Sequence, residues 1–458
     1  MHFVWIVCLL LLASCTQRDL KLKDLSLSQS ASSYLKTDSQ TTLNALEIQK
    51  LQQTLKDNYL KAWYSPWIDM KAKSNLKEVF WMLPIVRNIQ GYGEDLKLNS
   101  KELNNALIAS MDIKHYPSVS IKAIVVRDAH IRAMPTNKPY YRSKKGYPFD
   151  RYQNSLIFQG TPVLITHFNT TKTYAHIQSS FVYGWVKTSD LAYMYNKDIE
   201  LLTHLKDYVM PKSDKIPLYT AYGNFYTNAR VGELFALIPP KKDPSKKMLY
   251  RTKEPLKAYG FSKDPKGYAT LQSITLNEKD FFLFPKALNS ANMAEMIDTM
   301  MGQKYGWGGL LENRDCSAFT RDSFANFGIL LPRNSYAQSH YANNYIDLSK
   351  MNAIEKERYI IAHATPFATL LYLKGHIMLY LGEYNHQAVV AHSVWSVQTQ
   401  KHFKTLSHNI GGVVITSLWL AKEHNGVFSK KRLLIDRVLG MSDLQAYIQT
   451  SLKTLNTN

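Results

Sequence analysis

The sequence is poor in cysteine, and its 458 residues contain only Cys8, Cys15 and Cys316. A disulfide framework is therefore excluded as the basis of the fold. Long apolar runs are also scarce: beyond the N-terminus, no stretch reaches the about 18 apolar residues that a membrane-spanning helix needs. Acidic residues are few as well. The 36 Asp and Glu against 56 Lys and Arg leave a net charge of +20, which favours polyanionic partners such as nucleic acid, anionic lipid headgroups or an acidic cell wall.

The remaining composition is that of a globular protein, with 45% hydrophobic and 20% charged residues. Wholesale disorder, collagen and coiled coil are excluded. Aromatic residues are abundant at 12% and favour β-rich modules. At roughly 100–200 residues per domain, the chain is expected to hold about three or four domains.

The N-terminus resembles a bacterial lipoprotein signal. Its apolar run, from Phe3 to Ala13, is too short to span a bilayer but suits the core of a signal peptide. The following Leu-Ala-Ser-Cys ends at Cys15, the residue that such signals lipidate. Residues 1–14 are predicted to be the signal peptide, and residues 15–40 the lipidated cysteine with a polar, flexible tether. An ordinary secretory signal or a buried helix is the alternative.

This resemblance implies an exported lipoprotein, held in the bacterial envelope by its lipid anchor and facing the periplasm. Thr16 and Gln17 carry no acidic retention signal, which favours the outer membrane if the cell has two.

Hydrophobic periodicity divides the rest of the chain into four units of a multidomain α+β fold. The first helix, from Thr41, should end at Pro66. Short β-type runs predict two small barrels. Helices followed by strands at residues 376–381, 389–394 and 413–418 form an α+β pattern. The predicted units are a helical domain at 41–117, barrels at 118–198 and 205–285, and an α+β domain at 288–458.

Cys316 is the one thiol left if Cys8 leaves with the signal and Cys15 takes lipid. The count alone leaves an inert and a catalytic role equally open. Cys316 falls in the first turn of a predicted helix, 315–327, where the helix dipole and the unpaired N–H groups favour a thiolate and lower its pKa. The same N–H groups can form part of an oxyanion hole.

Two of the 14 histidines stand out. His376 opens an apolar strand directly after a glycine, and His392 lies on the next strand. With a hairpin turn at 383–387, both imidazoles can share one sheet face, one as base and the other as its orienting partner. Structural strand histidines are the alternative.

No cofactor or metal site is predicted. The sequence has no CxxC, HExxH, Walker or Rossmann motif, and zinc at Cys316, His376 and His392 remains only a geometric alternative. Basic residues are scattered without a nucleic-acid module, so nucleic acid is not expected as a partner.

Several motifs resemble the NlpC-type, papain-like cell-wall cysteine peptidases, over residues 288–440. Upstream segments at residues 132–136, 149–153, 160–163 and 184–186 resemble a first bacterial SH3-like domain, and 205–285 a second. Trp63-Tyr64-Ser65-Pro66-Trp67 is similar to the helical stabilising domain that precedes them. The peptidase motifs are YGWGG (305–309), RDCSAF (314–319), LPRNSYAQ (331–338), GHIMLYLG (375–382) and AHSVW (391–395).

The resemblance implies a γ-D-glutamyl–diamino acid endopeptidase that acts on peptidoglycan stem peptides or their released fragments. The enzyme is expected to be a monomer and to need no cofactor. Cys316 would be the nucleophile, His376 the general base and His392 the residue that orients it. In relatives, the first SH3-like domain closes over the cleft and restricts substrates to those with a free N-terminus.

Further residues are implied at the substrate side. Asp315 and Ser317 flank the nucleophile, and Asp315 is expected to cap the helix and to pair with a free ammonium of the substrate. Trp307 would wall the cleft or pack in the core, and Arg333 and Ser335 border the pocket.

Two residues depart from the family pattern: Ala318 replaces a common glycine, and Phe367 replaces the glycine of a usual Pro-Gly. Neither belongs to the Cys-His-His set. Two other functions stay open: a peptidoglycan-binding lipoprotein with an inactive peptidase fold, and an acyl- or amidotransferase that uses the same thiol.

Overall fold

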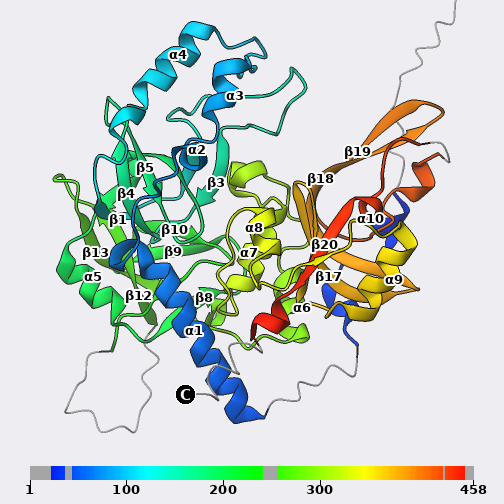
Figure 1. The fold of residues 1–458 in the computed structure, drawn as a ribbon. Coiled ribbons are helices and arrows are strands. Elements are labelled where there is room, and N and C mark those ends of the chain that lie inside the picture. The colour runs from blue at the N-terminus through cyan, green and yellow to red at the C-terminus, as the bar shows by residue number, and fades with distance from the viewer. Residues whose placement is uncertain (1–21, 37–43, 241–254, 427–428, 449–458) are drawn as a thin grey trace, which may run out of the picture.

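The computed structural model describes residues 22–36, 44–240, 255–426 and 429–448. The predicted signal peptide and Cys15 lie outside these residues. Within them, no helix is long and apolar enough to cross a membrane. The chain combines helices, β-domains and a mixed C-terminal domain (Figure 1), which confirms the predicted fold class.

The helical region starts with the long helix α1, Ala45–Ile68, whose N-terminus carries an Asn44–Glu47 capping box. The prediction that Pro66 ends this helix is wrong by two residues. Proline lacks the N–H that would bond to the Ala62 carbonyl, but the Ser65 hydroxyl donates to that carbonyl at 2.8 Å. The last turn therefore survives. The shorter helices are α2 (Leu76–Val79), α3 (Leu83–Asn88) and α4 (Lys101–Ser110).

The first β-domain is a seven-stranded antiparallel sheet in the order β3-β2-β6-β5-β4-β1-β7. Helix α1 packs against it, and the indole N–H of Trp67 donates to the carbonyl of Ala123 at 2.7 Å. The strands are β1 (Ile121–Val125), β2 (Ala129–Arg132), β3 (Gln153–Ile157), β4 (Pro162–Phe168), β5 (Tyr174–Gln178), β6 (Tyr183–Lys187) and β7 (Leu191–Tyr193).

The second β-domain follows helix α5, Asn196–Thr203. It has a four-stranded sheet, β10-β9-β13-β12, and a three-stranded sheet, β11-β8-β14. The strands are β8 (Tyr208–Pro211), β9 (Ile216–Thr220), β10 (Phe225–Ala229), β11 (Phe235–Ala236), β12 (Leu256–Lys263), β13 (Ala269–Leu276) and β14 (Phe281–Leu283).

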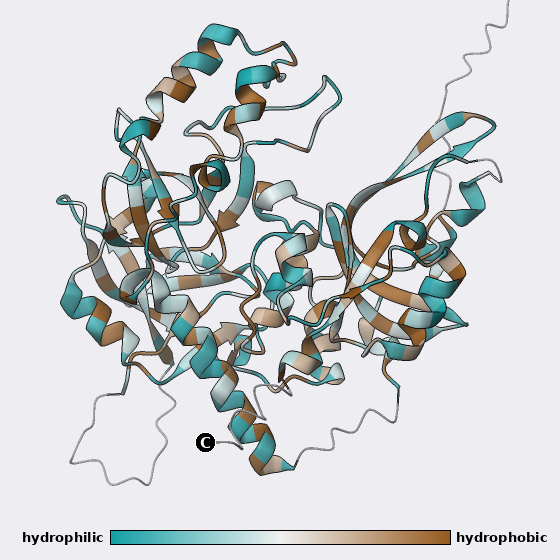
Figure 2. Ribbon diagram, in the orientation of Figure 1, coloured by the Kyte–Doolittle hydropathy of each residue, from teal (hydrophilic) through white to brown (hydrophobic). Residues whose placement is uncertain are grey.

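The C-terminal domain is built on a six-stranded antiparallel sheet in the order β15-β20-β16-β17-β18-β19. Helix α7 packs against β17 and β18. The strands of this sheet carry long apolar stretches, drawn brown in Figure 2. The elements are α6 (Ser290–Asp298), α7 (Cys316–Ala325), α8 (Ser335–Ser339), β15 (Ile346–Asp347), α9 (Ala353–His363), β16 (Thr369–Leu373), β17 (His376–Tyr384), β18 (Gln387–Lys401), β19 (Lys404–Ser417), α10 (Leu434–Arg437) and β20 (Val438–Asp443).

Residues 22–36, which we call the N-terminal strap, also belong to this domain, so the prediction of a flexible tether over residues 15–40 is wrong for this part. The Gln29 side chain bonds both the N–H and the carbonyl of Ile415, and Asp24 accepts from the N–H of Ser417 at 2.7 Å. These bonds lie along the edge strand β19, so the strap covers an otherwise unpaired sheet edge.

Candidate active site

Cys316 is the first residue of helix α7 and is 8% exposed. Asp315 caps the helix by accepting from the N–H of Ala318 at 3.0 Å. The backbone N–H groups of Ile377, at the start of β17, and of Ser317 point at the Cys316 sulfur. The thiol therefore lies where the helix N-terminus meets the first residues of β17.

The two predicted histidines lie side by side. Strands β17 and β18 are joined by a tight turn at Asn385 and His386, both with positive φ, as a two-residue hairpin turn requires. The Nε2 atom of His376 is 2.8 Å from Nδ1 of His392, and Nε2 of His392 is 3.1 Å from the hydroxyl of Thr416 on β19.

This chain of bonds assigns the protons. Thr416 donates its hydroxyl proton to the carbonyl of Ser417 at 3.0 Å, so it accepts from Nε2–H of His392. Nδ1 of His392 then accepts from Nε2–H of His376. His376 keeps an unprotonated Nδ1, which is the lone pair that a general base needs.

Burial sets the charge state of the pair. It raises the pKa of the Cys316 thiol to about 12, and the neighbouring charge of Asp315 adds to the shift. It also lowers the pKa of His376 to about 3, helped by Arg437, and it lowers the pKa of His392 well below the usual value. At neutral pH the Cys316 thiol and the His376 imidazole are therefore both uncharged. The sequence-based expectation of a lowered thiol pKa is wrong, because burial outweighs the helix N-terminus.

Asp315 and Ser317 are tied to Arg333, which is 8% exposed. Its guanidinium donates to the Asp315 carboxylate at 2.7 Å, to the Ser317 hydroxyl at 2.5 Å and to the Ser155 hydroxyl of β3 at 3.0 Å. The N–H of Gly308 donates to the same carboxylate at 2.9 Å. Burial opposes ionisation of Asp315, but Arg333 outweighs it and holds the pKa of this carboxyl below its usual value.

Arg314, which precedes Asp315 in the sequence, is held by the second β-domain. Arg314 is 1% exposed and makes a two-pronged ion pair with Asp214, at 2.5 and 2.9 Å. It also donates to Asp322 of α7 at 2.7 Å. Together, Ser155 and Asp214 connect both β-domains to the residues around the thiol.

Aromatic side chains line the junction between the first β-domain and the site. Trp307 is half-buried, donates its indole N–H to the carbonyl of Asp150 at 2.7 Å and meets Phe149 edge-on at 5.2 Å. Tyr305 was missed in the residue-by-residue prediction, although it stands in the YGWGG motif. Its backbone bridges to Arg314, two residues before the thiol, and its pKa is raised by burial and then by the charges of Asp315 and Cys316.

Ser335 is the first residue of α8 and is partly buried. The described hydrogen bonds do not join its side chain to the thiol or to the histidines. Among the residues that the structure describes, no group of three or more His, Cys, Asp or Glu side chains is placed to hold a metal ion.

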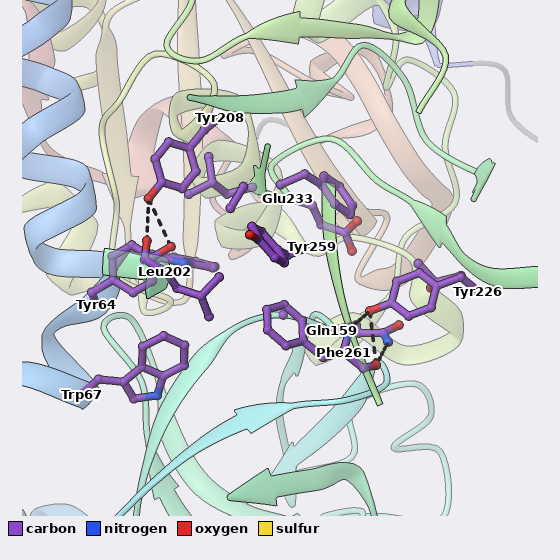
Figure 3. Close-up of a pocket in the computed structure, with 15 residues that line it drawn as sticks. Tyr64, Trp67, Gln159, Leu202, Tyr208, Tyr226, Glu233, Tyr259 and Phe261 are labelled. Carbon is purple, nitrogen blue, oxygen red and sulfur yellow. Dashed lines mark hydrogen bonds between the residues drawn. The ribbon is translucent and has the colours of Figure 1, made fainter. Parts of the chain in front are cut away.

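A cavity of about 20 Å³ lies away from these residues, where α1 meets the two β-domains (Figure 3). Trp67, Tyr208 and Phe261 are among its aromatic walls. Glu233 also lines it, and burial raises the pKa of this carboxyl well above its usual value. The cavity has room for about one water molecule, so we interpret it as a packing junction.

Comparisons with known proteins match four segments of the chain. Residues 4–116 match the N-terminal NLPC_P60 stabilising domain, 138–187 an SH3 domain of SH3b1 type, 196–242 an SH3 domain of SH3b2 type, and 302–435 the NlpC/P60 family. The search of curated proteins gave no match.

Two solved structures are similar. An NlpC/P60 endopeptidase from Photobacterium damselae subsp. piscicida superposes with a TM-score of 0.76 at 23% identity, covering 92% of this chain and 97% of that chain. An NlpC/P60 family protein from Bacillus cereus ATCC 10987 gives a TM-score of 0.43 at 14% identity, covering 70% of this chain and 98% of that chain. The first likeness shows a shared fold.

Proposed function

We propose a specific activity for this chain, which carries an NlpC/P60 domain behind a stabilising domain and two SH3 domains: it hydrolyses the γ-D-glutamyl–diamino acid bond of peptidoglycan stem peptides. The family match supports the coarser assignment, a cell-wall cysteine peptidase. The observation that carries the proposal is the hydrogen-bond chain from Thr416 through His392 to His376, whose neighbour Ile377 directs its backbone N–H at the sulfur of Cys316.

In the first step, the Cys316 sulfur attacks the γ-glutamyl carbonyl carbon while Nδ1 of His376 takes the thiol proton. The protonated His376 still donates through Nε2 to His392, which holds the ring in place. The backbone N–H at the start of α7 faces the developing oxyanion. The same proton then passes to the leaving amine of the diamino acid, which leaves a thioester on Cys316.

In the second step, His376 takes a proton from water, and the resulting hydroxide attacks the thioester carbonyl. The carbon–sulfur bond breaks, His376 returns its proton to the sulfur, and the product leaves with a new γ-carboxyl group, which releases its own proton to solvent. Each turnover consumes one water and returns the enzyme to its neutral pair.

The substrate's free ammonium is proposed to bind at Asp315. Four donors already fill this carboxylate, and the longest of these bonds, at 3.3 Å, comes from the Ser317 hydroxyl. An ammonium would replace that hydroxyl at the least cost, because Ser317 keeps its bond from Arg333. Exposed stem peptides with a blocked N-terminus would lack this interaction.

The anchor at Cys15, export to the envelope and a monomeric state are further parts of the proposal. Cys15 and the signal peptide lie outside the described residues, so the proposals of a lipid anchor and of export rest on the sequence pattern alone.

The test compares the unaltered protein with the Cys316→Ala variant on two substrates, the peptide L-Ala-γ-D-Glu-diaminopimelate and purified peptidoglycan. Mass spectrometry should find L-Ala-D-Glu released from the peptide by the unaltered protein alone. A peptide with an acetylated N-terminus serves as the control for the Asp315 interaction and should be cut more slowly. Binding of both proteins to peptidoglycan without any cleavage would favour the inactive binding protein.

A further inference from the structure

The β18–β19 hairpin extends beyond the sheet. Strand β17 pairs with β18 only as far as Ala391, whereas β18 and β19 pair with each other out to Lys401 and Lys404. Figure 1 shows this two-stranded ribbon projecting from the C-terminal domain. Its tip is Phe403, whose side chain is 90% exposed.

The backbone at this tip is unfavourable for its residues. His402 and Phe403 have φ values of 48° and 62°, in the left-handed region that tight hairpins fill with Asn or Gly. A bulky residue pays a steric cost there, and such strain is common where a side chain has a function. The geometry of the turn therefore does not explain why an exposed phenylalanine occupies this position.

Basic residues lie along the ribbon and on the segment that packs beside it. The segment after β19 packs beside the ribbon: the N–H of Lys430 donates to Gln400 at 2.8 Å, and the ammonium of Lys431 donates to Gln398 at 2.8 Å. The acidic residues nearby include Glu423, and Asp436, whose carbonyl accepts from the Arg432 guanidinium. We call the exposed group Lys401, Phe403, Lys404, Lys422, Lys430 and Arg432 the ribbon patch.

The N-terminal strap begins beside this patch. The N–H of Lys23 donates to the Glu423 carboxylate at 2.7 Å, and Leu22 is buried in one cluster with Leu418 and Leu420. Six residues lie between Cys15 and Leu22, so the two are at most about 25 Å apart. A lipid on Cys15 would thus hold this side of the domain close to a bilayer.

We propose that the ribbon patch docks on the anionic surface of the membrane that holds the Cys15 lipid, an inference that rests on the proposed anchor. Phe403 inserts among the headgroups, and the basic residues of the patch contact lipid phosphates. Aromatic insertion and charge attraction together distinguish a bilayer from a purely polar polyanion. One flexible anchor lets the enzyme swing, and this second attachment fixes which way its cleft faces.

The experiment uses residues 20–458, which contain every described residue and no lipid, in flotation assays with vesicles of phosphatidylcholine alone or mixed with phosphatidylglycerol. The Phe403→Asn variant removes the ring but suits the turn, and its matched control is Tyr222→Asn, at another highly exposed aromatic residue, 92% exposed. The Lys401→Glu/Lys404→Glu variant reverses the charge, with Lys50→Glu/Lys61→Glu on α1 as its control.

We expect binding to the phosphatidylglycerol vesicles alone, falling with added salt. Phe403→Asn should weaken it about tenfold, as loss of a buried aromatic side chain implies, and the charge reversal by more than tenfold. Both control variants should bind normally. Absence of vesicle binding, or equal losses in the controls, overturns the proposal. The proposal is also overturned if the patch variants bind vesicles normally but lose binding to isolated peptidoglycan, because the patch would then serve a wall polymer.

Cleavage of the soluble peptide is measured on the same protein preparations without vesicles and should not change in the patch variants. Because this cleavage assay contains no lipid, failure of the peptidase and failure of docking are separate results.

Discussion

Arg333 should be the residue on which the geometry around the thiol most depends. Replacing it with Met leaves the buried Asp315 carboxylate without its counterion, and breaking a buried ion pair in this way costs about 3–5 kcal/mol. For a domain of this size, about 2–4 °C of melting temperature is lost per kcal/mol, so a fall of about 6–20 °C is expected. Peptide cleavage should fall as well, because Arg333 also holds Ser317 beside the nucleophile.

The loss should depend on pH with a definite sign. Arg333 holds the pKa of Asp315 below its usual value, so the stability from this pair is present above the unfolded pKa of about 3.9 and is lost as pH falls through the folded one. The difference in melting temperature between Arg333→Met and the unaltered protein should be full at pH 7 and shrink below about pH 4.

Two further variants complete the assay, which combines calorimetry with peptide turnover. Ser155→Ala removes one hydrogen bond to Arg333 and should cost about 1–3 kcal/mol of stability. Its melting temperature should therefore fall by less than that of Arg333→Met. Arg127→Met breaks an exposed ion pair with Asp190 and should cost less than about 1 kcal/mol. If Arg333→Met melts and turns over like Arg127→Met, the role given to Arg333 is refuted.

Three other outcomes are expected. Alkylation of Cys316 by iodoacetamide should be slow at neutral pH and rise about tenfold per pH unit above it, since burial raises the thiol pKa to about 12; a flat rate between pH 6 and 8 would indicate a thiolate–imidazolium pair. His376→Ala should lower turnover about 10³-fold or more and His392→Gln less, because His392 acts only through the His376 ring; equal losses would contradict that division. Glu233→Gln should raise the melting temperature increasingly from pH 5 to 8, since the raised pKa of this carboxyl makes its ionisation costly; a pH-independent difference would count against that cause.

The positions of Cys316, His376 and His392 in their elements could be predicted because they follow local patterns, whereas their catalytic roles came from the family resemblance. A polar cap before an apolar helix placed Cys316, and two apolar strands around a short turn placed His376 and His392 on one face. The domain order was also readable, because each segment has its own periodicity.

Partners that depend on distant pairing could not be predicted. Thr416 meets His392 only through the register of β18 and β19, and Asp214 meets Arg314 across 100 positions of sequence. The thiol pKa was mispredicted for the same reason, since its burial comes from elements far along the chain. The strands expected at 389–394 and 413–418 were too short, because the ribbon beyond them has no core to impose an apolar pattern.

Phe367 stands where the family pattern has a glycine, and its buried ring compensates for the backbone conformation of this position. Its φ is 61°, the left-handed value that a glycine adopts freely. The side chain is 2% exposed and packs in the cluster around the thiol. Burial of this ring offsets the backbone strain, so the turn before β16 keeps its shape.

The measurement that tests the central claim most directly is the mass of the enzyme quenched in acid during turnover of L-Ala-γ-D-Glu-diaminopimelate. The account predicts a transient L-Ala-γ-D-glutamyl adduct on the peptide that contains Cys316, absent from Cys316→Ala. Cleavage of the substrate by Cys316→Ala, or turnover by the unaltered enzyme with an adduct on another residue, would contradict it.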